Sequence, residues 1–150
     1  MPARLVLALA AAGLLAACGP AKPKPDEAIT ADQLPHIKVG QWEVTTVANG
    51  QAQPTRTSCS PAGRLPMPIT VRLYGCNAQP TLARTGAGAI TVDLNCATQY
   101  AIATQHTTIS GDFNASFVSQ TRLSLDDRQG RPPTVTEVRQ SFRYLGACPP

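Results

Sequence analysis

The sequence predicts an all-β fold: an antiparallel meander of about seven strands, forming a curled sheet or small barrel and bridged by disulfides. From residue 38 onward, apolar and polar residues alternate with a period of two, and no 3.6-residue period is sustained. Turn-forming clusters separate the alternating runs. Four cysteines lie within this region, which allows two internal bridges.

The first segment, residues 1–17, has the composition of a signal peptide. Arg4 supplies a positive charge, and residues 5–15 form an apolar run that is shorter than the roughly 20 residues needed to span a bilayer. The run ends at residues 15–18, Leu-Ala-Ala-Cys, which resembles the lipobox of bacterial lipoproteins. This resemblance implies cleavage before Cys18 and acylation of that cysteine, which would anchor the chain to a membrane. The alternative is an ordinary secreted protein that is cut after Ala17.

Residues 18–36 are expected to form the lipidated N-terminus and a flexible tether, because proline and charged residues dominate them. Gly19, rather than aspartate, follows the cysteine. In diderm bacteria this resembles the outer-membrane sorting pattern. We therefore expect the protein on the periplasmic side of the cell envelope, anchored in the outer membrane.

Residues 37–150 are expected to form the β-domain. The alternation is clearest where one face carries Ile90, Val92, Leu94 and Cys96. Two other sets share a strand parity: Phe113, Ala115, Phe117, Leu123 and Leu125, and then Tyr100, Ile102 and His106. Turns are expected at Asn49-Gly50, 86–88, 110–112 and 126–133, and a longer crossing loop at 60–68. A sheet with one apolar face must cover that face, so we expect it to curl.

Four cysteines remain after the anchor: Cys59, Cys76, Cys96 and Cys148. A hairpin centred on Gly86 places Cys76 opposite Cys96 on one face, within reach of a disulfide. By elimination, Cys59 pairs with Cys148. A metal site is the alternative, but the sequence has no Cys-x-x-Cys pair, and both histidines lie far from any cysteine in the sequence. We therefore predict two disulfides and no metal or cofactor.

The opening strand, residues 39–46, reads Val-Gly-Gln-Trp-Glu-Val-Thr-Thr. It resembles the first strand of the family known as domain of unknown function 3617. The similarity continues through Cys59, the hairpin between Cys76 and Cys96, and the closing residues 144–148, and it covers roughly residues 37–148. The family has no established activity, so the resemblance implies an exported β-domain and no particular chemistry.

No set of catalytic residues is apparent. His106 shares the parity of Tyr100 and Ile102, so it could point inward, where a lone histidine is more often a packed or rim residue. Asp126 and Asp127 fall in a turn and are expected at a solvated tip, and Trp42 is expected in the core. The arginines are scattered rather than clustered, which argues against a nucleic-acid partner.

Three classes of function remain open. We favour a non-enzymatic binding module of the cell envelope that takes up a partner protein or a small apolar ligand. The second is a structural or assembly accessory that acts through exposed strand edges. The third, the least favoured, is a hydrolase built on His106 with a carboxylate. A concave apolar pocket would favour ligand binding, whereas a filled core with an exposed edge would favour assembly.

Overall fold

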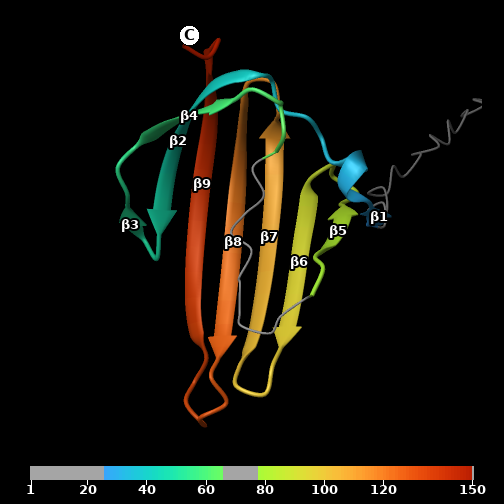
Figure 1. Ribbon diagram of the computed structural model, residues 1–150, viewed down its shortest axis with the longest axis vertical. Coiled ribbons are helices and arrows are strands. Elements are labelled where there is room, and N and C mark those ends of the chain that lie inside the picture. Colours follow the sequence, from blue (N-terminus) through green and yellow to red (C-terminus); the bar gives the residue numbers. More distant parts are fainter. Residues whose placement is uncertain (1–25, 66–77, 150) are drawn as a thin grey trace, which may run out of the picture.

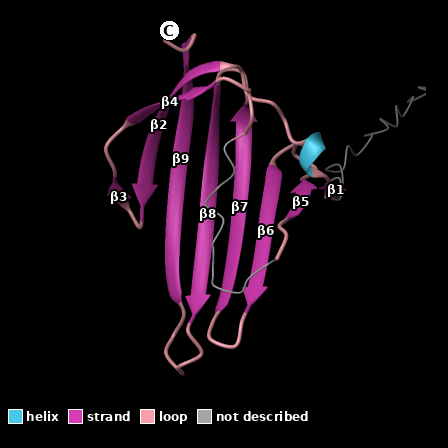
Figure 2. Cartoon of the chain, viewed as in Figure 1, coloured by secondary structure: helices cyan, strands magenta, loops and turns pink. Residues whose placement is uncertain are grey.

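The computed structural model describes residues 26–65 and 78–149. Within these ranges nine strands form one antiparallel sheet, accompanied by a short 3-10 helix, Ala31–Gln33 (Figures 1 and 2). The strands are β1 (Glu27–Ile29), β2 (Gly40–Ala48), β3 (Gln51–Ala52), β4 (Arg56–Ser60), β5 (Thr81–Arg84), β6 (Ile90–Ala97), β7 (Ile102–Asp112), β8 (Ser116–Asp126) and β9 (Thr134–Gly146). The predicted all-β class is confirmed, and among these strands the sheet is curled and open.

The order of strands across the sheet is β1-β5-β6-β7-β8-β9-β2-β3, and β4 also pairs with β2. Strands β5 to β9 therefore form the expected meander. The meander does not run through the whole domain, because β4 does not continue to β5 and β2 pairs with β9 instead (Figure 1). Alternation along a strand specifies which face each residue occupies but does not specify the neighbouring strand.

The two edges of the sheet are short. Strand β1 pairs with β5 at one edge through three residues. At the other edge β3 and β4 lie along successive parts of β2, with Pro54 in the gap between them. Short edge strands and proline limit unwanted pairing between sheets.

Part of the expected tether belongs to the folded domain. Residues 27–29 form β1, and Ile29 and Leu34 pack against the hydrophobic core. The guanidinium of Arg84 also donates a hydrogen bond to the carbonyl of Gln33. A flexible tether is therefore wrong for residues 27–34, because Ile29 and Leu34 are partly buried against the core. The predicted signal peptide and Cys18 lie outside the described residues.

The β5–β6 hairpin differs in register from the prediction. The backbone N–H of Thr85 donates to the carbonyl of Ala89, which closes a three-residue loop centred on residue 87 rather than on Gly86. Gly88 has φ +85°, the left-handed conformation that such a loop requires. Leu82 consequently faces Val92 instead of residue 90. The shift is two residues, so every side chain keeps its predicted face.

The β7–β8 turn also lies later than predicted. Strand β7 runs through Asp112, beyond the turn expected at 110–112, and the backbone N–H of Ala115 donates to the carbonyl of Asp112. Phe113 and Ala115 are therefore turn residues and do not continue the parity of β8. Phe117, the next residue on that parity, is the first buried residue of the strand.

One face of the sheet, here called the inner face, carries the aromatic core. The ring of Phe117 stacks on that of Phe142 with a centroid distance of 4.3 Å, and the ring of Trp42 meets Phe117 edge-on at 5.4 Å. Trp42 is 1% exposed and donates its indole N–H to the carbonyl of Lys38 at 2.9 Å, so it is a core residue as predicted. Apolar burial of this kind is the main stabilising term of the fold.

The inner face becomes polar toward the middle of β7 and β8. Thr107, Gln105 and Ser119 are all buried there. The hydroxyl of Thr107 lies 3.0 Å from that of Thr121 and accepts a hydrogen bond from the Gln105 amide. Among the described residues, no buried side-chain nitrogen or oxygen lacks a hydrogen-bond partner. In the described part of the interior, no buried polar side chain is therefore left unpaired for a ligand.

The structure joins Cys59 at the end of β4 to Cys148, the pair predicted by elimination, with their Cα atoms 5.7 Å apart. The pairing follows from β2, which lies between β4 and β9 and brings the end of β4 close to the C-terminus. Cys96 is disulfide-bonded as well. Its predicted partner, Cys76, lies outside the described residues.

Candidate functional site

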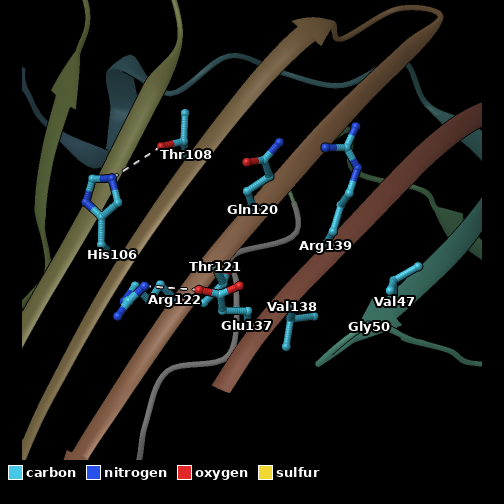
Figure 3. Close-up of a pocket in the computed structure, with 10 residues that line it drawn as sticks. All are labelled: Val47, Gly50, His106, Thr108, Gln120, Thr121, Arg122, Glu137, Val138 and Arg139. Atoms are coloured by element: carbon cyan, nitrogen blue, oxygen red, sulfur yellow. Dashed lines mark hydrogen bonds and ion pairs between the residues drawn. The ribbon is translucent and has the colours of Figure 1, made fainter. Parts of the chain in front are cut away.

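The opposite face of the sheet, here called the outer face, contains a hollow of about 400 Å³ across β7, β8, β9 and the end of β2 (Figure 3). This volume falls within the roughly 300–1,000 Å³ typical of ligand pockets. The residues lining this outer hollow are Val47, Gly50, His106, Thr108, Gln120, Thr121, Arg122, Glu137, Val138 and Arg139. Most of them are polar, in contrast to the concave apolar pocket that would accompany a small apolar ligand.

Two transverse rows of side chains build the outer hollow. Even-numbered residues of β7 and β8 and odd-numbered residues of β9 point to the outer face, because side chains alternate along each strand. One row runs through Thr108, Gln120 and Arg139, which lie directly opposite one another on adjacent strands. Adjacent strands are about 4.8 Å apart, so this row spans roughly 10 Å.

The second row is Asp93, His106, Arg122 and Glu137, in strand order from β6 to β9. His106 Nδ1 lies 2.6 Å from Asp93 Oδ1, and Arg122 Nη1 lies 3.0 Å from Glu137 Oε1. Both basic side chains of this row, His106 and Arg122, are therefore paired with a carboxylate. Figure 3 shows the Arg122–Glu137 pair at the lower rim of the outer hollow.

The possibility that His106 points inward is wrong. The inward residues of β7 are the odd-numbered ones, and the side chain of His106 is 57% exposed on the outer face. The sequence pattern misleads because Tyr100 lies in the turn before β7 and is 74% exposed, while Ile102, the first residue of the strand, is only half-buried. Apolar residues at the end of a strand therefore do not indicate which face of that strand is buried.

His106 also lies 3.3 Å, through Nε2, from the hydroxyl of Thr108. Together with Asp93 this forms a chain of hydroxyl, imidazole and carboxylate, the order of groups found in nucleophilic triads. However, the ladders on both sides of β7 engage its backbone N–H groups. The strand thus offers no free pair of N–H groups to stabilise an oxyanion beside Thr108.

Two side chains of the outer hollow have no partner among the residues that the structure describes: the guanidinium of Arg139 and the amide of Gln120. Arg143, the next outward arginine of β9, is held by Glu43 at 2.9 Å. Arg139 is therefore the uncompensated positive charge of the hollow, and it points in the same direction as Gln120 (Figure 3).

Three other depressions are less well equipped to bind a ligand. One of about 530 Å³ on the outer face has Glu43 and Arg143 as its charged residues, and these are already paired. One of about 220 Å³ beside Asp93 continues the second row. The apolar one, about 240 Å³ beside Trp42 and Phe142, is smaller than most ligand pockets.

The remaining predicted residues do not contribute to the outer hollow. Asp126 ends β8 and Asp127 begins the β8–β9 loop; each carboxylate accepts a backbone N–H from two residues later, and Asp127 pairs with Arg131. The hydrogen bond from Gln129 and the interaction with Arg131 lower the pKa of Asp127 below its usual value. In the described part of the chain, no group of three or more His, Cys, Asp or Glu side chains could hold a metal ion.

No helix within the described ranges is long and apolar enough to cross a membrane. A family model described as a protein of unknown function, DUF3617, matches residues 37–148. No curated protein and no solved structure matches the chain. The chain belongs to the DUF3617 family, the family that the sequence resembles.

Proposed function

We propose that this DUF3617 protein is a non-enzymatic binding module of the bacterial cell envelope, a lipoprotein anchored through Cys18, which binds a polar ligand in the outer hollow. One observation carries the proposal. The hollow holds an arginine and a glutamine with no partner in the described chain, while the neighbouring arginines on the same face are neutralised. Polar groups left free in a concave site are what fixes the orientation of a bound ligand.

The lining of the outer hollow favours a polar ligand over the small apolar ligand suggested by the sequence. Val47 and Val138 are its only large apolar side chains, and Val138 belongs to the inner parity of β9. An apolar ligand would cover Arg139 without replacing the water bound to it, and such desolvation is unfavourable. A ligand with hydrogen-bonding groups would compensate for that cost.

An assembly role through strand addition has weaker support. Strand β4 offers five residues and β3 offers two, with Pro54 between them. Strand addition depends on a run of free backbone groups along a sheet edge. These short segments provide few such groups in succession.

A hydrolase is the second candidate, because His106 lies between Asp93 and the hydroxyl of Thr108. The imidazole and carboxylate are both more than half exposed, so water would compete with every step. The test is hydrolysis of p-nitrophenyl acetate by the purified protein, compared with Thr108→Val. We expect equal rates; a loss of activity in Thr108→Val that leaves folding unchanged would establish the hydrolase instead.

The binding proposal is tested by native mass spectrometry of the full-length protein extracted gently from membranes. We expect a bound species on the wild type that is lost or strongly reduced in Arg139→Gln. Arg56→Gln is the matched control, because Arg56 is an exposed arginine of β4 that lies away from the outer hollow. If the ligand is equally absent from both variants, or retained by both, the outer hollow is not the binding site.

The membrane anchor is tested separately. Replacing Cys18 by serine should abolish labelling with a clickable palmitate analogue and release the protein from the membrane fraction. The proposed anchor is supported by the signal-peptide composition of residues 1–17, which end in the lipobox-like residues 15–18, and by the odd number of cysteines. Labelling that persists in Cys18→Ser would show that another residue is acylated or that the leader is processed differently.

A further inference from the structure

We propose that the outer hollow recognises the carboxylate of a small hydroxylated acid, with Arg139 as the anchoring residue. The inference rests on the proposed binding function and names its ligand class. Arginine presents N–H donors in a planar fork that matches the two oxygens of a carboxylate. Arg139 is exposed and has no partner among the described residues, so this fork is available.

Two other arginines on the outer face each bind a carboxylate of the chain. Arg143 contacts Glu43 Oε1 through both Nε and Nη2, at 3.0 and 2.9 Å, and Arg122 contacts Glu137 at 3.0 Å. Arg122 and Arg143 therefore each hold a carboxylate supplied by the chain. At Arg139 the residue directly opposite on β2 is Val47, which offers no charge.

The charges around Arg139 favour a monoanion. Glu137 lies two residues away on the same strand and face, roughly 7 Å along the backbone. One negative charge on the ligand would be matched by Arg139. A second negative charge, as on a phosphate dianion, would remain unmatched, because Arg122 and Glu137 beside Arg139 already neutralise each other.

The neighbours of Arg139 in the first row favour hydroxyl groups on the ligand. Gln120 lies opposite Arg139, and Thr108 lies opposite Gln120. An amide and a hydroxyl can each donate and accept hydrogen bonds, as can the hydroxyls of a sugar acid. The geometry places the carboxylate at the β9 end and hydroxyls toward β7, within the roughly 10 Å of the row.

The test is an NMR titration of the full-length, detergent-solubilised protein with glucuronate, following the Nε–H signals of arginine and the side-chain amide of glutamine. Glucose and inorganic phosphate are the comparison probes. We expect glucuronate to shift the signals of Arg139 and Gln120, and its affinity to fall about tenfold or more in Arg139→Gln. Arg139→Lys should recover only part of the affinity, and Arg56→Gln should bind as the wild type does.

The outcomes separate the ligand class from the proposed function. Glucose binding as tightly as glucuronate would overturn carboxylate recognition, and phosphate binding as tightly would reduce the site to a general anion site. If mass spectrometry finds an Arg139-dependent ligand without a carboxylate, the binding function stands and the ligand class is wrong. If no species is carried by the extracted protein and no probe shifts Arg139, the function and the ligand class both fail.

Discussion

The two faces of the sheet belong to the same strands but differ in burial, as residues 117–122 of β8 show. Phe117 points to the inner face and is 2% exposed, and Ser119 beside it is 4% exposed. Gln120 and Arg122 point to the outer face and are exposed. Gln105, Thr107 and Thr121 bond to one another on the inner face, whereas Gln120 and Arg139 of the outer hollow have no partner among the described residues. We infer that stability depends on the inner face and recognition on the outer face.

The largest effect is expected from removing the Cys59–Cys148 disulfide, which lies near the aromatic core of the inner face. The disulfide holds β4 beside β2, where Ser58 lies opposite Trp42. Its sequence separation is 89 residues. On the chain-entropy model, replacing Cys59 and Cys148 by serine should lower the free energy of unfolding by about 4–5 kcal/mol. Urea denaturation without reductant measures this loss. A change within ~0.5 kcal/mol, the range of ordinary surface substitutions, would contradict it.

The next largest effect is expected from a pair of substitutions in β8, one on each face of the sheet. Phe117→Ala removes the ring that stacks on Phe142 and contacts Trp42 edge-on. We expect the free energy of unfolding to fall by about 3–5 kcal/mol. Gln120→Ala, on the same strand and the opposite face, should change it by no more than about 0.5 kcal/mol while weakening ligand binding. Equal losses of stability in the two variants would show that the faces do not divide stability from recognition.

A smaller effect tests how the charges of the outer face are paired. A double-mutant cycle with Arg122→Gln and Glu137→Gln should give a coupling free energy of about 0.2–1 kcal/mol, as is usual for exposed pairs. The coupling should largely disappear near 1 M salt, where the screening length is about 3 Å. If there is no coupling at low salt, Glu137 does not neutralise Arg122. Arg122 would then be a second arginine of the outer hollow that is free to bind a ligand, with the net charge of the hollow unchanged.

The sequence predicts the inner face better than it predicts the binding site. Alternation places Ile90, Val92 and Leu94 on the buried face because burial requires an apolar residue at every second position. It could not predict that β2 pairs with β9, since that pairing joins distant segments of the chain. Arg139 gives no local signal, because one arginine on an outward parity is typical of any solvated strand. Only the register shows which neighbouring arginines are paired and which one is not.

The smallest expected effect lies in the β8–β9 loop, which belongs to neither face. The backbone N–H of Gln129 donates to Asp127 and Arg131 pairs with it, and both interactions lower the pKa of Asp127 below its ordinary value of 3.8. A lowered pKa in the folded state means that the carboxylate stabilises the fold above the ordinary value, and that this contribution is lost as the pH falls through the folded pKa. Asp127→Asn should therefore lower stability slightly at neutral pH and have no effect at the most acid pH. Arg131→Gln should reproduce only part of the change, because the backbone hydrogen bond is the larger cause. NMR titration of the Asp127 carboxyl together with urea denaturation from acid to neutral pH measures both, and a difference between Asp127→Asn and wild type that grows toward acid would reverse the sign of this contribution.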